Sequence, residues 1–228
     1  MHFIFMLTRR DQTVEDCLET LDLVADLGVR HIGFKDVGAP TEVLKELNRR
    51  IKAGGAVSYM EVVSVTPDRA RQSLATARDI GVDRVLGGTD VAAAGEIFGD
   101  LSGYFPFAGR PVGHPTQLEG SAQLVGEHCR ACRAAGCGGV DLLAYRATEA
   151  EPLELVRSAR GALGDKLLIV AGSVNSPDRI HDLGRAGADA FTIGSAALDG
   201  SFSPTKGSLR SQIADILAAC RTESQAVA

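Results

Sequence analysis

The sequence predicts an α/β protein, a single (β/α)8 TIM barrel that forms one domain over residues 1–228. Two observations predict this fold. A strand-like apolar run and a helical stretch recur together about every 27 residues, and glycine-rich loops follow the last two strands rather than the first. With 228 residues, 45% of them hydrophobic and 23% charged, the chain has the composition of soluble globular proteins and a length typical of one barrel.

Four glycines mark the repeat, and each of them ends a helical stretch a few residues before a strand begins. They are Gly28, Gly81, Gly136 and Gly187, spaced 51 to 55 residues apart. Glycine adopts the left-handed conformation that terminates many helices, so we expect each one directly after a helix. Further strand-like runs divide each interval in two.

The pattern places eight strands along the chain, at residues 3–8, 31–35, 57–63, 84–88, 111–114, 140–145, 167–171 and 190–194. Strands that alternate with helices at this spacing form right-handed βαβ units and a parallel sheet, and eight units favour closure. An open doubly wound sheet would instead carry a Gly-x-Gly-x-x-Gly phosphate loop after the first strand. No such motif follows Thr8.

The loops after the seventh and eighth strands both combine glycine with serine. Gly172 and Ser173 follow the seventh strand, and Gly194 and Ser195 follow the eighth. Barrel enzymes commonly seat a phosphate on the backbone N–H groups of these two loops and at the N-terminus of a short extra helix. We therefore expect these four residues to bind phosphate. The alternative is that both glycines serve only turns and packing.

Residues 167–200, LLIVAGSVNSPDRIHDLGRAGADAFTIGSAALDG, resemble the phosphate-binding half of the ribulose-phosphate-binding TIM barrel superfamily. That group includes sugar-phosphate epimerases and isomerases, decarboxylases and keto-acid-phosphate aldolases. The resemblance covers the last two strand-helix units, and the rest of the chain only as general barrel architecture. It implies a phosphorylated ligand and does not choose a reaction.

Alignment of the repeats on their glycines predicts which strand side chains face the barrel interior, because side chains alternate along a strand. It places Lys35 at the inner, C-terminal end of the second strand and Asp141 one layer below, on the sixth. A charge in a dry interior is costly unless it is paired, and an active site explains that cost. A buried ion pair that only stabilises the barrel is the alternative.

Other polar side chains are predicted at the same mouth. Glu61 lies near the end of the third strand, His114 at the end of the fifth and Arg146 at the end of the sixth. A carboxylate, an imidazole and a cation are the usual parts of proton transfer beside a carbonyl on an anionic substrate. Short strands leave the facing of Glu61 and His114 open by one residue.

The favoured function is a lyase of the class I aldolase kind, acting on a small phosphorylated carbonyl or sugar-phosphate substrate. An amine at Lys35 would attack the carbonyl and form a Schiff base, Asp141 or Glu61 would move protons, and His114 would assist. One departure counts against a direct transfer of roles. The keto-acid-phosphate aldolases of the group carry their lysine on the sixth strand, where this sequence reads LAYR at 143–146.

Two alternative functions are kept. The first is a sugar-phosphate isomerase or epimerase in which Glu61 and Asp141 act as acid and base and Lys35 stabilises an enediolate electrostatically. The second is a non-catalytic barrel that binds a phosphorylated metabolite, since a fold does not fix a function. The sequence does not identify the substrate.

Composition and charge bound the partners. A net charge of −5 without a basic stripe argues against nucleic acid, and no apolar run reaches the roughly 18 to 20 residues of a membrane span. Arg9 and Arg10 follow the first apolar strand where a secretory signal would continue, so we expect a cytoplasmic protein. No cofactor and no metal are expected, and Cys129, Cys132 and Cys137 are interpreted as buried structural thiols. Whether the chain forms a homo-oligomer is left open.

Overall fold

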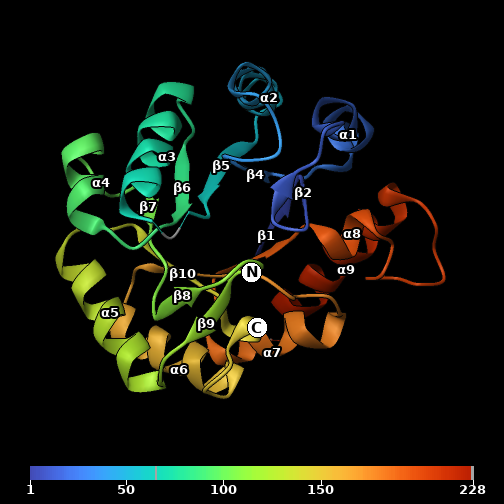
Figure 1. Cartoon of the computed structure of the whole chain (residues 1–228). Coiled ribbons are helices and arrows are strands. Elements are labelled where there is room, and N and C mark those ends of the chain that lie inside the picture. The colour runs from blue at the N-terminus through green and yellow to red at the C-terminus, as the bar shows by residue number, and fades with distance from the viewer. Residues whose placement is uncertain (65, 227–228) are drawn as a thin grey trace.

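A computed structural model describes residues 1–64 and 66–226 and shows a parallel barrel inside a ring of helices (Figure 1). In this described part of the chain, eight strands form one parallel sheet in the order β10-β11-β12-β1-β4-β5-β6-β7. The strands are β1 (His2–Met6), β4 (His31–Lys35), β5 (Val57–Val62), β6 (Arg84–Gly87), β7 (Tyr104–Phe105), β10 (Gly139–Leu142), β11 (Leu167–Val170) and β12 (Ala190–Ile193).

The barrel closes between β7 and β10 through two main-chain hydrogen bonds of Asp141. The Asp141 amide donates to the Pro106 carbonyl at 2.9 Å, and the Ala108 amide donates to the Asp141 carbonyl at 3.2 Å. Phe107 and Asp141 form a parallel bridge there. The predicted fold class, a (β/α)8 barrel, is therefore confirmed.

Helices follow the barrel strands around the outside in chain order, as Figure 1 shows. They are α1 (Cys17–Val24), α2 (Thr41–Ala53), α3 (Pro67–Ile80), α4 (Val91–Phe98), α5 (Ala122–Ala134), α6 (Pro152–Leu163), α7 (Pro177–Ala186), α8 (Ser195–Leu198) and α9 (Leu209–Ala226), with short 3-10 turns η1 (Ala25–Leu27) and η2 (Ala144–Arg146). The glycines of the repeat follow these helices in the left-handed conformation, with φ of 74° at Gly28, 76° at Gly81, 85° at Gly136 and 98° at Gly187. The predicted helix ends are confirmed.

Two hydrophobic layers show which way the strand side chains point. The barrel interior holds a small cluster that includes Ile4, Met6, Tyr59, Leu86, Phe105 and Ile169. The larger cluster lies between the strands and the surrounding helices and contains Phe34, Val140 and Leu142, among others. Because side chains alternate along a strand, Lys35 and Asp141 point the other way, into the barrel, as the sequence alignment predicted.

The predicted position of the fifth strand is wrong. The barrel strand is β7 (Tyr104–Phe105), whereas residues 111–114 belong to an antiparallel hairpin of β8 (Arg110–Val112) and β9 (Gln117–Glu119). Proline at position 111 has no amide to donate to a barrel ladder, which suits an edge or hairpin strand. The true strand has only two residues, too few to show a period of two.

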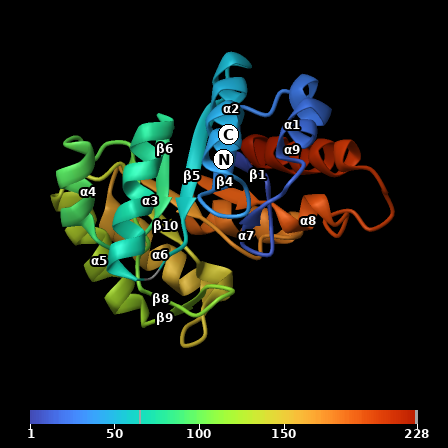
Figure 2. The ribbon, with the colours of Figure 1, turned by 45° about the horizontal axis from the view of Figure 1, so that its top comes forward.

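Two hairpins cover the C-terminal end of the barrel. One consists of β2 (Thr8–Arg9) and β3 (Gln12–Thr13), the other of β8 and β9, and both views of the ribbon place the second hairpin beyond the strand ends (Figures 1 and 2). The two-residue turn of the first hairpin has positive φ at both positions, 52° at Arg10 and 59° at Asp11. Such a turn matches the twist of a hairpin and points its side chains sideways.

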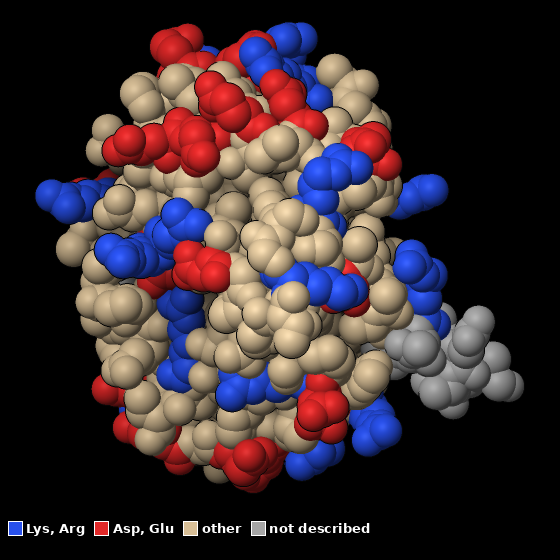
Figure 3. Space-filling view, turned by 90° about the vertical axis from the view of Figure 1, so that its right-hand side faces the viewer, with Lys and Arg blue, Asp and Glu red and all other residues tan. Residues whose placement is uncertain are grey.

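The outer surface shows no large single-sign region on the face drawn in Figure 3. Lysine and arginine there are interspersed with acidic and uncharged residues. Within residues 1–64 and 66–226, none of the helices has the length and apolar character needed to cross a bilayer.

Close strand contact makes one barrel glycine sensitive to substitution. A Cβ at Gly139 of β10 would lie 1.8 Å from the Leu167 carbonyl oxygen, whereas a Cβ at exposed Gly161 of α6 would meet nothing within 4 Å. We expect Gly139→Ala to lower the free energy of unfolding by about 2 kcal/mol or more through overpacking. Gly161→Ala should raise it by about 0.5–1 kcal/mol because alanine favours the helix. Urea unfolding of both variants tests this, and equal effects would contradict the packing described.

Candidate active site

A cavity of about 300 Å³ opens at the C-terminal mouth of the barrel. The two loops that follow β11 and β12 line one side of it. Its lining also includes five charged residues, Asp11, Lys35, Glu61, Arg146 and Asp199, of which Asp199 belongs to the end of the second loop. The cavity therefore joins the predicted phosphate loops to a group of buried charges.

Lys35 and Glu61 are brought together by the sheet register, which pairs them across β4 and β5. The Lys35 Nζ lies 3.3 Å from Glu61 Oε1 and 2.9 Å from Asp11 Oδ1. All three side chains are buried, at 4 to 7% exposure. The Thr13 hydroxyl also bonds both the amide and the carbonyl of Lys35 at 2.8 Å, which fixes the end of the strand. Asp11 and Glu61 therefore both form ion pairs with Lys35 at the wall of the cavity.

Asp11 is the centre of this group, and sequence reasoning missed it. It accepts hydrogen bonds from Arg146 at 3.0 and 3.1 Å, from Lys35 at 2.9 Å and from the Thr116 amide at 3.2 Å. Burial alone would raise the pKa of Asp11, but the hydrogen bonds and charges of Arg146 and Lys35 outweigh it and hold this pKa well below its usual range. The turn that carries Asp11 gives no periodic signal, so only its hairpin chemistry could have pointed to it.

Arg146, in η2, lies between Asp11 and the first phosphate loop. Besides its two bonds to Asp11, it donates to the Thr116 carbonyl at 3.1 Å. A Cβ at Gly172 would come within 2.4 Å of Arg146 Nε, so the guanidinium lies directly against this glycine. Burial tends to lower the pKa of Arg146, but Asp11 outweighs that and raises it. A permanent cation thus borders the loop that is predicted to bind phosphate.

Asp141 is fully buried beneath these charges and does not line the cavity. Neither carboxyl oxygen has a hydrogen-bond partner among the described residues. Burial, and then the charge of Glu61, raise the pKa of Asp141 well above its usual value despite the opposing effects of Lys35 and Arg146. The raised pKa favours the uncharged form of this buried carboxyl group.

The phosphate loops have the close backbone approach that their glycines predicted. Gly172 and Ser173 adopt left-handed conformations, with φ of 77° and 58°. A Cβ at Gly194 would lie 2.6 Å from the Thr8 carbonyl oxygen, so glycine is needed for this loop to pass the end of β1. Ser195 begins α8, where the first amides of a helix have no intrahelical acceptor.

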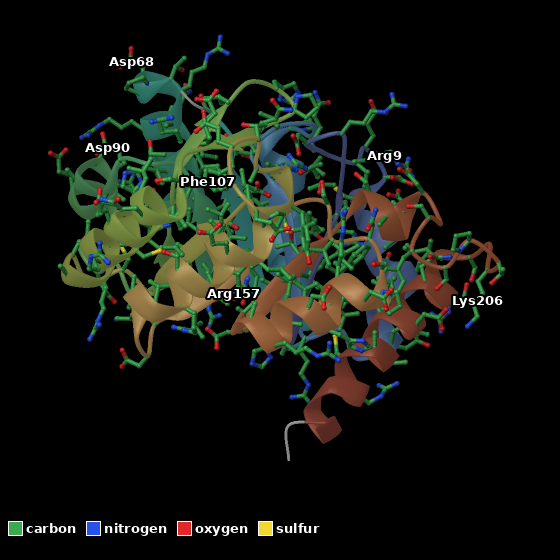
Figure 4. All side chains as sticks on the ribbon, turned by 90° about the horizontal axis from the view of Figure 1, so that it is seen from below. Arg9, Asp68, Asp90, Phe107, Arg157 and Lys206 are labelled. Carbon is green, nitrogen blue, oxygen red and sulfur yellow. The ribbon has the colours of Figure 1, made fainter. Side chains whose placement is uncertain are left out.

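Two arginines brace the loops from outside the cavity. Arg179 donates to the Ser173 carbonyl, and its guanidinium stacks 4.4 Å from the centre of the Tyr145 ring. Arg9, labelled in Figure 4, lies 2.6 Å from Asp199 and donates to the Leu198 carbonyl at 2.9 Å. The first hairpin is thereby tied to the end of α8.

The structure does not bring His114 into this cavity. It lies in the turn between β8 and β9, is exposed, and lines a separate cleft with Gly113 and residues of α3. The prediction placed it at the end of a barrel strand, and the displaced fifth strand explains the difference. Lys35 and Glu61 meet at the cavity and Asp141 lies behind them, whereas His114 is separate.

In the described ranges 1–64 and 66–226, no group of three or more His, Cys, Asp or Glu side chains is arranged to hold a metal ion. The three cysteines of the 129–137 segment are buried. Burial raises the pKa of Cys129 to about 12, as expected for an inert thiol.

Comparison with known proteins finds likeness in structure and none in sequence families. No family model matches the chain, and neither does any curated protein. Thiamine phosphate pyrophosphorylase from Pyrococcus furiosus is 16% identical with a TM-score of 0.65, over 97% of this chain and 96% of that one. Orotidine 5'-phosphate decarboxylase from Pyrococcus horikoshii OT3 is 16% identical with a TM-score of 0.66, over 96% and 99%. A structure described as "Native KDPGal structure" is 13% identical with a TM-score of 0.67, over 99% and 97%.

The chain has the TIM-barrel fold of these three structures. The resemblance that residues 167–200 predicted is thus confirmed at this level. Identities of 13 to 16% show the fold alone, so the reaction has to be argued from the site.

The buried acid makes a testable contribution to stability. Where folding raises the pKa of an acid, the free energy of unfolding falls as the pH rises. The fall runs from the pKa of the acid in the unfolded state, about 3.9, toward its pKa in the folded state. Asp141→Asn replaces the neutral acid by a neutral amide of similar shape, so it should remove that decline and stabilise the protein at pH 8 relative to the wild type. Urea unfolding between pH 5 and 9 measures this. Asp68→Asn, at an exposed position of α3, is the control and should keep the wild-type profile.

Proposed function

We propose that this chain is an enzyme that moves a proton beside the carbonyl of a small phosphorylated compound, as a sugar-phosphate isomerase or epimerase does. The observation that carries the proposal is the Lys35 ammonium, held by two buried carboxylates on the wall of a cavity whose other wall is the glycine loops. Two of the similar structures carry names that contain a phosphate compound, which supports a phosphorylated ligand.

The phosphate would bind to the loops at Gly172, Ser173, Gly194 and Ser195. Their glycines allow the backbone to approach closely, and Ser195 begins the short helix α8. Arg146 adds a cation against Gly172. With the phosphate at this end, the rest of a small substrate extends across the cavity toward Lys35 and Glu61.

In the proposed reaction, Glu61 acts as the base. Its carboxylate removes the proton from the carbon next to the carbonyl, and the electron pair of that C–H bond forms the C=C bond of an enediolate. The negative charge that develops on the carbonyl oxygen is stabilised by the Lys35 ammonium. Return of the proton by Glu61 to the neighbouring carbon, together with transfer of the proton of the adjacent hydroxyl to the former carbonyl oxygen, completes an isomerisation. An epimerisation instead requires water to protonate the same carbon on the opposite face of the enediolate. Asp141 does not line the cavity, so its part is to keep the group of charges balanced.

A class I aldolase-type lyase is the second candidate, because Lys35 lines the cavity and an amine there could attack a substrate carbonyl. Schiff-base formation needs the neutral amine. In the structure Lys35 instead forms ion pairs with Asp11 and Glu61, and this geometry suits electrostatic stabilisation of an enediolate better than attack by an amine.

The phosphate loops can be tested without knowing the substrate. Gly172→Ala forces a side chain into a left-handed position and against Arg146, so it should weaken binding of inorganic phosphate at least tenfold. Gly207→Ala, where a Cβ meets nothing within 4 Å, is the matched control and should bind as the wild type does. Phosphorus NMR titration measures both. Equal affinities in the two variants would place phosphate elsewhere.

The reaction can be tested with a panel of three- to six-carbon aldose and ketose phosphates in D₂O. We expect deuterium to enter the carbon next to the carbonyl, as read by proton NMR. Glu61→Gln should slow this exchange by about 10²–10⁴-fold, and Lys35→Met by about 10²–10³-fold. Lys45→Met, on the exposed face of α2, is the control and should exchange at the wild-type rate.

Borohydride trapping separates the two candidates. Reduction during turnover should add no mass at Lys35 under the enediolate mechanism, whereas a Schiff base would add the reduced substrate there. A substrate-derived adduct on Lys35 would therefore replace the isomerase proposal by the lyase. Binding of the panel without exchange or cleavage would leave a phosphometabolite-binding barrel.

A further inference from the structure

A second, polar cleft of about 530 Å³ lies beside the candidate active site and shares none of its lining residues. It is bounded by the end of β4, the loop after β5, one side of α3 and the turn of the β8–β9 hairpin. Residues adjacent in the sequence line different cavities. Asp11 and Lys35 line the first, and the next residues, Gln12 and Asp36, line the second.

A guanidinium and an imidazole reach this cleft from two elements that are far apart in the sequence. Arg69 extends from α3, and His114 from the tip of the β8–β9 hairpin. Arg69 forms no ion pair with any described residue, unlike Arg71 two positions on, which lies 2.6 Å from Glu96. A guanidinium that lines a cleft and has no carboxylate partner is suited to a planar anion, which it can bind through two parallel N–H bonds.

Asp36 is the acidic group of the cleft, and it is only half satisfied. Ser73 donates to one of its carboxyl oxygens, whereas the other is buried and has no hydrogen-bond partner among the described residues. Burial, opposed by the Ser73 bond, raises the pKa of Asp36. Asp36 lines the cleft, so its carboxyl group is placed to accept a hydrogen bond from a hydroxyl of a bound molecule.

Uncharged polar groups complete the lining. Amides and hydroxyls come from Gln12, Thr41, Ser64, Thr66, Gln72 and Thr76. Each hydroxyl or amide both donates and accepts, so the wall matches a ligand that carries several hydroxyl groups. Both loops of the phosphate cavity carry a glycine, whereas Gly113 is the one glycine among the described residues that line the cleft. Its chemistry is therefore that of a carboxylate with hydroxyl groups beside it.

We propose that this cleft is a binding site for a small hydroxycarboxylate, separate from the phosphate cavity. The carboxylate pairs with Arg69, and the hydroxyl groups bond to Asp36 and the amides and hydroxyls of α3. The site does not depend on the reaction proposed for Lys35, because it is built from different residues. Both sites lie at the end of β4, because Lys35 lines one cavity and Asp36 lines the other.

Calorimetric titration of the full chain with glycerate, threonate and gluconate tests the proposal, with propionate and glycerol as probes that lack either the hydroxyls or the carboxylate. We expect at least one hydroxycarboxylate to bind with saturation, and propionate and glycerol to bind at least tenfold more weakly. Arg69→Ala should weaken the binding at least tenfold. Arg71→Ala, on the same helix but paired with Glu96, should leave it unchanged.

Two controls keep this result separate from the active-site proposal. Gly172→Ala, which disturbs the phosphate loop, should bind the hydroxycarboxylate as the wild type does, and inorganic phosphate should not compete. The proposal is overturned if none of the three acids saturates, if Arg69→Ala and Arg71→Ala bind equally, or if phosphate displaces the acid. Thermal unfolding of Arg69→Ala should match that of the wild type, which would show that the substitution leaves the fold intact.

Discussion

The constraint on which the site depends is charge balance in a dry barrel mouth. Lys35 and Arg146 are both held by Asp11, Glu61 contacts Lys35, and Asp141 lies below without a hydrogen bond. A buried charge without a partner costs several kcal/mol. For Asp141, burial first and the charge of Glu61 second raise the pKa, while Lys35 and Arg146 oppose this rise.

The same network determines how the mouth is covered. Asp11 sits on the β2–β3 turn, accepts from the Thr116 amide near the β8–β9 turn, and accepts from Arg146 in η2. One carboxylate therefore joins two hairpins that belong to opposite parts of the chain. The left-handed turn at Arg10 and Asp11 is the local cost of this arrangement, and strained backbone of this kind is common at functional sites.

The sequence predicted the parts of the molecule that have periodic or local signals. Glycine at each helix end, alternation along the strands and the paired loops at Gly172 and Gly194 identified the barrel, the inward facing of Lys35 and Asp141, and the candidate phosphate loops. The prediction failed where a strand was too short to show a period of two. The fifth strand was therefore predicted at the wrong residues, and His114 was placed wrongly at its end. The prediction also missed Asp11, because the contact between this turn residue and Lys35 forms only when the hairpin folds back over the barrel.

The site also explains why a lysine on the second strand need not act as a nucleophile. A nucleophilic amine works when its surroundings disfavour charge, either through apolar burial or through a nearby cation. Lys35 has the opposite surroundings, since Asp11 and Glu61 lie within 2.9 and 3.3 Å and offset its burial. A fixed ammonium beside a developing oxyanion stabilises a transition state without having to lose its proton first. The lysine at position 35 suggested a covalent mechanism from sequence alone. Its carboxylate neighbours in the folded protein favour an electrostatic role instead.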